Sequence, residues 1–460
     1  MSELSVRSIS GKDGSPVMFP DGISIGAGAP GGTNNIGTAG GQGFGVGVCP
    51  GPLPSGMGAL FGYSDPSSDN YGNYQYSDGS VMCWIPAFYY KWGTGANGIT
   101  LNQVVIKAFS EYADVATANA AGYALHRAFY DGGAVQPGVF VDKYLASYTT
   151  GGIASSIKNG IVLSSAARGT LSNEVFSDLT GAPAATLGGA IAAAKTRGSS
   201  FFCSSRFIFS ALAMLAYAHG QASVATTYCA WYHATNNFPK GANNNALGDA
   251  QDADILYVND GNGTYAGAAK TGSANLFART THNGQNSGVC DLNGNFYEFT
   301  PGLTSNGTNY FLLNSAVAMK NVTGSNTLAT DLFGATGLAA MYTDLGTTYG
   351  AITKSGGWKY FGAATQVFSE ATSGTAWAVA GCGIPLLAGT GGTNAFGNDG
   401  LYDPTPAVNE MAFLSSGYWG NSSNAGVWCA TLDSYRTISG SIFGFFKYYY
   451  IFFIYTDSLK

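Results

Sequence analysis

The feature that most constrains the fold is a tight turn near the middle of the chain, within residues 287–299. The dipeptide Asn293-Gly294 lies there between two short runs that mix polar and apolar residues. Asn and Gly tolerate the positive φ values that a two-residue hairpin turn requires, and the flanking runs have the composition of half-buried strands. We therefore expect a β-hairpin at this point, with one compact domain built around it.

The abundance of glycine and the scarcity of charge argue against long helices. Glycine accounts for 67 of the 460 residues, and charged residues make up 10% of the chain, whereas typical proteins have roughly 7% glycine and about 25% charged residues. With 45% hydrophobic residues, including 28 tyrosines and 27 phenylalanines, the chain is too apolar to be disordered. These features favour a loop-rich protein with substantial β-structure, and the length suits more than one domain.

Charge and hydropathy exclude two classes of partner. The net charge is −6, and the lysines and arginines are scattered, so the sequence lacks the basic cluster that nucleic-acid binding requires. No apolar run reaches the roughly 18 residues that span a bilayer, so no membrane insertion is expected. Residues 1–7 lack a secretory signal pattern, which predicts synthesis in a bacterial cytoplasm.

The seven cysteines are odd in number, widely spaced and without a C-x-x-C pair. This pattern does not fit a zinc site or a complete disulfide framework. Buried free thiols are the interpretation that we favour.

Changes in amino-acid composition along the chain suggest three regions. Residues 1–80 are rich in Gly, Pro, Ser and Asn, and we expect them to attach the protein to a larger particle or to mediate oligomerisation. Residues 81–137 form a small β region, with strands expected within 81–92 and 103–109. Residues 138–460 form the main domain, which opens with a strand candidate at 138–147.

Two helices are predicted. The first covers residues 187–196 and ends at Gly198, a good C-cap residue. The second starts after Ser204 or Ser205 and continues to about Ala218, with apolar residues at helical spacing almost all round, so it should be buried. From residue 301 to about 360, short β-prone runs alternate with Gly and Asn turns, and loops are expected to dominate.

Residues 288–299 also resemble, nearly position by position, the signature Gly-Val/Ile-x-Asp-Leu-x-Gly-Asn-x-x-Glu-Trp of formylglycine-generating-enzyme-like, C-type-lectin-like domains. Phe299 stands where the family usually has Trp. Residues 138–147 are similar to the opening strand of this family, with Leu145 in place of its Glu. The segment 238–248 is similar to the Pro-Lys/Arg-Gly-Asn-Asn-x-x-Gly segment of its phage members.

A second match lies near the C-terminus. Residues 417–436 resemble the pattern Gly-x-Trp-x-x-Gly-x-x-Ala-Gly-Val-Phe of phage receptor-binding proteins, some of which are diversified by retroelements in this region. The pattern of those proteins closes in Gly-Phe-Arg, whereas Phe446 takes the place of the Arg here. The resemblance covers roughly residues 138–448 and does not reach the first 80 residues.

The resemblance implies an α+β fold with a C-type-lectin-like C-terminal domain and a Gly-rich, mainly β N-terminal region. It further implies a homotrimeric bacteriophage virion protein that binds a host cell-surface glycan or protein, contacts other virion proteins and has no enzymatic activity or resident cofactor. The candidate ligand-binding residues combine rigid aromatic area with adaptable polar groups: Tyr418, Trp419, Asn421, Ser422, Ser423, Asn424, Asp433, Ser434 and Tyr435. The signature residues expected to be structural are Asp291, Asn293, Gly294, Asn295 and Glu298.

Three alternatives stay open beside host recognition. A structural virion decoration or tail-knob protein could use the same fold. A sulfatase-modifying oxidase would need two neighbouring thiols to hold copper, but residues 430–436 after Cys429 contain no second cysteine. Hydrolytic chemistry lacks a motif, because the four histidines, His126, His219, His233 and His282, are isolated in sequence.

One loop has the composition of a calcium site. Asp249, Asp252 and Asp254 precede the run 259–262, and their oxygens are ligands that calcium prefers. The loop lacks the full EF-hand spacing and the bidentate Glu. A solvated loop is the more ordinary interpretation of the same residues.

Overall fold

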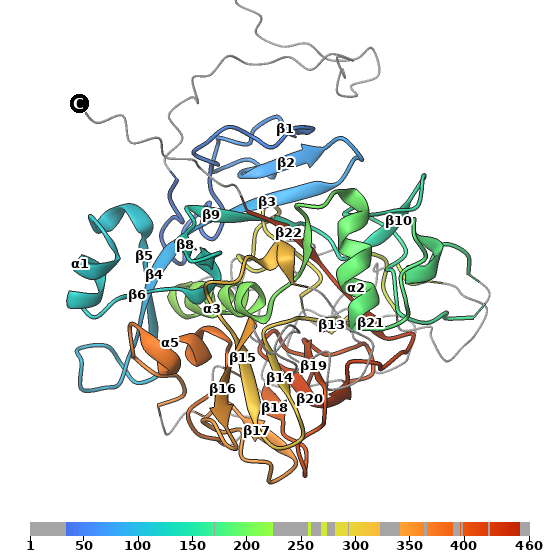
Figure 1. Cartoon of the computed structure of the whole chain (residues 1–460). Coiled ribbons are helices and arrows are strands. Elements are labelled where there is room, and N and C mark those ends of the chain that lie inside the picture. The colour runs from blue at the N-terminus through green and yellow to red at the C-terminus, as the bar shows by residue number, and fades with distance from the viewer. Residues whose placement is uncertain are drawn as a thin grey trace, which may run out of the picture.

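The protein is described here by a computed structural model. The described residues are 34–169, 171–223, 256–258, 268–273, 281–292, 294–322, 341–362, 366–389, 396, 399–421 and 424–450. Helices and mainly antiparallel sheets are mixed along this part of the chain, which confirms the α+β class. In Figure 1 a sheet with strands from the first part of the chain lies at the top. A helix from residues near 210 lies near the middle, and most of the later strands lie below this helix.

The upper sheet has six strands in the order β1-β2-β3-β9-β22-β12, and all neighbours are antiparallel (Figure 1). Its strands are β1 Met57–Ala59, β2 Asn73–Tyr76, β3 Val81–Pro86, β9 Gly138–Asp142, β22 Lys447–Tyr449 and β12 Phe202–Cys203. The strands come from all three regions expected from the sequence. Strand pairs of this sheet cross the expected boundaries at 80/81 and 137/138.

The two faces of the upper sheet bury different residues. Because side chains alternate along a strand, Cys83 and Ile85 of β3 pack into the main core, whereas Met82 and Trp84 join a smaller cluster on the other face. The main core is one continuous cluster that extends from Ile36 to Tyr450. The described part of the Gly-rich N-terminal region is thus packed against the rest of the same chain.

Both predicted helices are present. Helix α2 covers Leu187–Ala194, is capped by the Thr186 side chain and continues as the 3-10 turn η4 Lys195–Arg197, which stops at Gly198. Helix α3 covers Arg206–Ala222, and Ser205 Oγ accepts a hydrogen bond of 3.2 Å from the backbone N–H of Ile208. Every side chain of α3 from Arg206 to His219 is buried, as the apolar pattern predicted.

A second six-stranded sheet has the order β17-β18-β20-β19-β13-β21. Its strands are β17 Trp358–Tyr360, β18 Gly400–Tyr402, β20 Ala430–Tyr435, β19 Met411–Ser415, β13 Tyr297–Phe299 and β21 Phe443–Gly444. The β18·β20 and β13·β21 pairs are parallel, and the other pairs are antiparallel. We call this the lower sheet.

The remaining elements surround these two sheets. Three-stranded sheets are formed by β4 Phe88–Trp92, β5 Val104–Ala108 and β6 Ala124–Leu125, and by β14 Leu303–Ser305, β15 Tyr310–Leu313 and β16 Tyr342–Gly346. Two-stranded pairs are β7 Tyr130–Asp131 with β8 Ala134–Val135, and β10 Ser147–Thr149 with β11 Ile153–Ser155. The short helices are α1 Val115–Ala120, α5 Gly374–Gly381 and the 3-10 turns η1 Phe109–Glu111, η2 Arg127–Phe129, η3 Phe176–Asp178 and η8 Met319–Asn321.

The expected hairpin around residue 293 is only half present. Strand β13 follows the turn, but residues 287–292 are not a strand. Their backbone groups bond to other segments instead, as when Cys290 N donates to Lys143 O and His282 N donates to Val289 O. The local pattern of residues was compatible with a strand, and these hydrogen bonds, one to the distant Lys143 and one to the nearby His282, override it.

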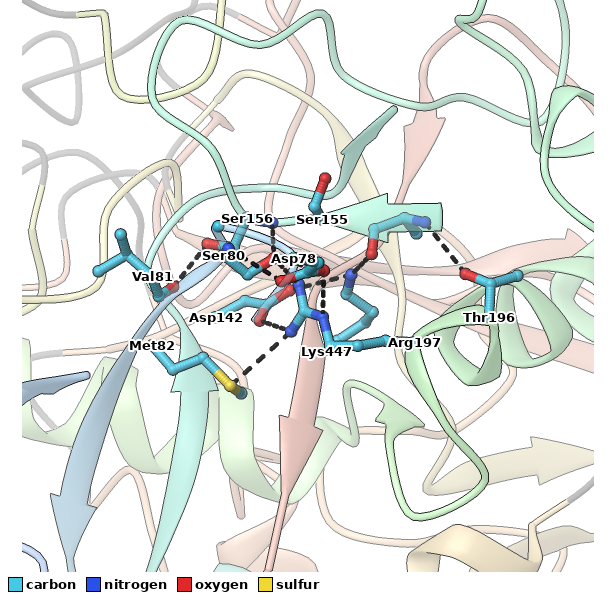
Figure 2. A network of polar contacts seen from close by, with 12 residues as sticks. Asp78, Ser80, Val81, Met82, Asp142, Ser155, Ser156, Thr196, Arg197 and Lys447 are labelled. Atoms are coloured by element: carbon cyan, nitrogen blue, oxygen red, sulfur yellow. Dashed lines mark hydrogen bonds and ion pairs between the residues drawn. The ribbon is translucent and has the colours of Figure 1, made fainter. Parts of the chain in front are cut away.

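A buried network of charges ties the ends of the described chain together (Figure 2). Arg197 contacts Asp78 at 2.9 Å and Asp142 at 2.6 Å, and it also donates to Ser80. Lys447 lies 3.6 Å from Asp142 and donates to the carbonyl of Ala154. The network therefore links the turn before β3, strand β9, the end of α2 and the C-terminal strand β22.

Removal of the guanidinium is expected to destabilise the fold strongly. In an Arg197→Ala variant, Asp78 and Asp142 keep their buried charges without the main partner, which should cost about 3–5 kcal/mol of unfolding free energy. The matched control is Lys107→Ala. This variant breaks a 2.7 Å pair with Glu111 whose side chains are 36% and 42% exposed, and such pairs are worth about 1 kcal/mol or less. Urea unfolding measures both, and equal small losses would contradict a structural role for the network.

Lys447 should make stability depend on pH. Burial, followed by the nearby Arg197, lowers the pKa of Lys447 to about 7, whereas a lysine in an unfolded chain titrates near about 10.4. Between these values the unfolded chain binds more protons than the folded protein, so the unfolding free energy rises with pH. From pH 7 to about pH 9 the wild type should gain about 2 kcal/mol relative to Lys447→Met, and parallel pH profiles would contradict this assignment.

Candidate ligand-binding face

One half of the lower sheet turns a row of aromatic and acidic side chains outward. In the strand register Trp358 of β17 lies opposite Tyr402 of β18, which in turn lies opposite Thr431 of β20. Residues two apart on a strand point to the same side, so Tyr360 shares the side of Trp358, and Asp433 and Tyr435 share the side of Thr431. We call Trp358, Tyr360, Tyr402, Asp433 and Tyr435 the outer face.

Solvent exposure shows that this side is open in part, although Thr431 is buried. Asp433 is exposed, Tyr435 is 58% exposed, and Trp358, Tyr360 and Tyr402 are half-buried. The alternate residues Leu401, Ala430 and Leu432 are buried and point into the core. The half of the sheet formed by β17, β18 and β20 therefore has one buried side and one side that is partly open to solvent, although β18 and β20 run parallel.

Three aromatic rings of the outer face, those of Trp358, Tyr360 and Tyr402, contact each other. The ring centroids of Trp358 and Tyr402 are 5.7 Å apart at an interplanar angle of 74°, and those of Trp358 and Tyr360 are 6.2 Å apart at 20°. Edge-to-face and offset contacts of this kind hold rings in fixed orientations. The outer face thus offers rigid aromatic surface rather than mobile side chains.

A buried carboxylate holds the loop that leads into β17. Asp403 Oδ2 accepts hydrogen bonds from the backbone N–H groups of Thr353 at 3.0 Å and Ser355 at 3.3 Å. Tyr310 Oη lies 3.5 Å from the other oxygen of the same carboxylate. Because Asp403 directly follows β18, this loop and the strand that carries Tyr402 are fixed to each other.

Arg206 supports the sheet from the core side. Its guanidinium donates to Cys382 O at 3.0 Å, to Ser415 Oγ at 3.0 Å and to Trp428 O at 3.4 Å. These acceptors lie after α5, at the end of β19 and just before β20. One arginine at the start of α3 thereby positions both ends of the segment 416–429 that joins β19 to β20.

The candidate residues of that segment divide into three groups. In the first group, Tyr418 and Asn424 are half-buried, and the ring centroid of Tyr418 lies 5.4 Å from that of Tyr297. Asn421 belongs to the same group, and its Oδ1 accepts a hydrogen bond of 2.8 Å from Tyr418 N. Ser422 and Ser423 lie outside the described residues. Trp419 is only 1% exposed and packs edge-on against Phe296 at 5.2 Å.

Two sequence-based candidates are therefore corrected. Trp419 belongs to the core, and Ser434 is 6% exposed because it occupies the inward position of β20 between Asp433 and Tyr435. Neither side chain is available to a surface ligand in this structure. The alternation of β20 separates Ser434 from its two exposed neighbours, and a single sequence did not reveal which of the three points inward.

The signature residues lie before and on β13, in the other half of the lower sheet. The carboxylate of Asp291 accepts hydrogen bonds from Gly272 N at 3.0 Å and Leu145 N at 3.3 Å. The side-chain amide of Asn295 exchanges two hydrogen bonds with the backbone of Ala269. Gly294 N donates a hydrogen bond of 3.2 Å to Ser416 Oγ. Asn293 lies outside the described residues.

Glu298 departs from the expected backbone-bonding role. Neither of its carboxyl oxygens has a hydrogen-bond partner among the described residues, and burial raises the pKa of Glu298 well above its usual range. A neutral carboxyl group beside the charged Arg206 is the state that this environment favours.

Sequence reasoning missed Trp358, Tyr360 and Tyr402. The signal for the first two was the aromatic–polar–aromatic alternation Trp358-Lys359-Tyr360, which has the period of a strand. Tyr402 had no such signal, because its strand is three residues long and its neighbours on the sheet are distant in sequence.

The buried thiols and histidines that follow favour their neutral forms. Burial raises the pKa of Cys382 to about 12 and that of Cys429 well above the usual range, so these thiols stay protonated. Burial also lowers the pKa of His126 to about 3 and of His219 and His282 to about 4. His233, Cys229 and the acidic loop of Asp249, Asp252 and Asp254 lie outside the described residues.

Comparisons with known proteins add little to this geometry. Within the described residues, no helix has both the length and the apolarity to cross a bilayer. No family model matches the chain, and no curated protein matches it. Among solved structures, the Major Tropism Determinant U1 Variant aligns with 82% of this chain at 11% identity and a TM-score of 0.28. The alignment covers 65% of that protein, and a TM-score of this size does not establish a common fold.

The different burial of Trp419 and Tyr435 should separate two effects of mutation. Trp419→Ala removes a buried ring from the core and should cost about 3–5 kcal/mol of unfolding free energy, whereas Tyr435→Ala should stay within about 0.5 kcal/mol. Urea unfolding of the two variants checks this difference. A Trp419→Ala variant as stable as the wild type would contradict the placement of its ring in the core.

Proposed function

We propose that this protein is a bacteriophage virion protein that binds a host cell-surface structure through the outer face and the adjoining residues Tyr418, Asn421 and Asn424. The observation that carries the proposal is a rigid sheet with Asp433 and Tyr435 exposed on it, within the segment that resembles phage receptor-binding proteins. We assign this sheet and α3 to a C-type-lectin-like domain on the strength of the sequence signature.

The physical arrangement suits recognition. A binding surface gains affinity when its contact groups are held in place before the ligand arrives, since less conformational entropy is then lost. Asp403 and Arg206 supply this preorganisation, because they fix the loop before β17 and the segment before β20. The aromatic rings provide contact area, and the carboxylate of Asp433 provides a hydrogen-bond acceptor.

Recognition without catalysis is the role that we assign to this site. The buried thiols and histidines have pKa values that favour their neutral forms, so they suit neither copper binding by thiolates nor general acid–base catalysis near neutral pH. We propose no resident cofactor, and calcium binding by the loop 249–262 stays a prediction.

Multivalency completes the proposed mechanism. A homotrimer repeated around a virion would convert a weak single site into tight adsorption, because each binding event raises the effective concentration of the next site. Light scattering of the purified protein tests this part, and a monomeric mass would contradict it.

Host adsorption tests the proposed function directly. Phage particles that carry Tyr435→Ala or Asp433→Ala should adsorb to host cells about tenfold less well, since exposed aromatic contacts at the centre of an interface are worth about 1–2 kcal/mol or more. The matched control is Phe61→Ala, which removes an aromatic side chain that is 93% exposed in the loop after β1. This control should adsorb normally.

Particle assembly separates recognition from a structural role in the virion. Electron microscopy of the same phage stocks should show intact particles for all three variants. Adsorption that stays normal in both outer-face variants would overturn the proposed function. Defective particles in those variants, with no specific loss of adsorption, would instead favour a decoration or tail-knob protein.

A further inference from the structure

We infer that Trp358, Tyr402 and Asp433 form a subsite for a neutral pyranose of a surface glycan. This inference rests on the proposed function, because it names the ligand class of the same outer face. Trp358 and Tyr402 lie outside the segment that the sequence resemblance marks for ligand binding, so the subsite extends the proposed surface across β18 to the edge strand β17.

The two rings form a corner. Trp358 and Tyr402 lie on paired positions of neighbouring strands with their planes at 74° and their centroids 5.7 Å apart. The C–H groups on one side of a pyranose are apolar and slightly positive, and they stack on the negative face of an aromatic ring. Both rings are half-buried, so each is held in place while part of it is left for a ligand.

Asp433 supplies the polar contact beside this corner. Its Oδ1 accepts hydrogen bonds from Thr431 Oγ1 at 2.5 Å and Ser434 Oγ at 3.4 Å, which fix the carboxylate. Its Oδ2 accepts no hydrogen bond from any described residue and is left for sugar hydroxyls. Because Asp433 is two residues beyond Thr431, which pairs with Tyr402, it lies about 7 Å along the strand from that pair. This spacing fits a single sugar ring.

The carboxylate of Asp433 favours a neutral sugar over an anionic one at this corner. Lys354 Nζ donates to Thr308 O at 2.8 Å, and Lys359 Nζ donates to Ser355 Oγ at 2.6 Å and Gly356 O at 3.0 Å. Arg436 is buried on the inward side of its strand. These hydrogen bonds hold the two lysine ammonium groups on protein acceptors, whereas the carboxylate of Asp433 is exposed on the outer face and would repel a sialic acid or a phosphorylated sugar.

The edge of the sheet argues against an extended peptide as the ligand. A peptide that added a strand to β17 would need its backbone groups to be free. Tyr360 O already accepts a hydrogen bond of 2.6 Å from Gly389 N, and the two residues form a β-bridge. The side chains of the outer face, rather than the edge of β17, are therefore the contact surface.

Titration of the full-length protein with simple sugars tests the inference. The probes are the methyl glycosides of glucose, galactose, mannose and N-acetylglucosamine, with N-acetylneuraminic acid as the anionic comparison, and calorimetry measures binding. At least one neutral glycoside should bind in the millimolar range, and N-acetylneuraminic acid should bind more weakly. Trp358→Ala should lower the affinity at least tenfold.

Two further variants keep this test interpretable. Trp377→Phe alters another half-buried tryptophan, which lies on α5 and donates to Leu125 O at 2.8 Å, and it should leave sugar affinity unchanged. Asp433→Ala changes an exposed side chain and should weaken binding without unfolding the protein, so it tests the subsite even if Trp358→Ala fails to fold.

Adsorption measured in parallel separates this inference from the proposed function. If none of the neutral glycosides binds, or if Asp433→Ala and a folded Trp358→Ala bind them as well as the wild type, the pyranose subsite is overturned. Adsorption that still depends on Tyr435 in that case would leave the proposed function standing, with a protein receptor as the ligand. Sugar binding that depends on Asp433, with adsorption indifferent to the outer face, would support the subsite and overturn the proposed function.

Discussion

A buried guanidinium is the interaction on which the candidate site depends. Arg206 begins helix α3, and its guanidinium donates only to segments more than 170 residues away in sequence among the described residues. A buried charge is costly unless its hydrogen bonds are satisfied, so the end of β19, the start of β20 and the turn after α5 must come together around it. Their convergence sets the position of the strand that carries Asp433 and Tyr435.

Alternate side chains on β18 and β20 of the lower sheet point to opposite sides, so one set packs in the core and the other set forms the candidate binding surface. Leu401, Ala430 and Leu432 are buried on one side, whereas Tyr402, Asp433 and Tyr435 stand on the other. The upper sheet contributes differently, because it joins the beginning of the described chain to its end through β22 and the Arg197 network. Two sets of buried charges thus have different roles: Arg206 and Asp403 hold the segments around the outer face, whereas the Arg197 network holds the upper sheet.

The sequence predicted elements that are specified locally. Both helices were predictable because capping serines and threonines and the apolar spacing lie within the helices themselves, and the strands around 81–92, 104–108 and 138–142 had clear β-prone composition. The strand expected before Tyr297 was wrong, because the backbone of Cys290 bonds to the distant Lys143 rather than to a neighbouring strand of a hairpin. Trp419 and Ser434 were misplaced for a related reason, since the composition of a segment does not reveal which of its side chains point inward.

Hydroxyl-radical footprinting of the full-length protein, free and bound to host cell envelopes, tests the central claim most directly. Oxidation of Trp358, Tyr402 and Tyr435 should fall on binding, while oxidation of the highly exposed Phe61 should not change. Protection of Phe61 and the loop after β1, with the outer face equally oxidised in both states, would contradict the claim that the outer face is the surface that meets the host.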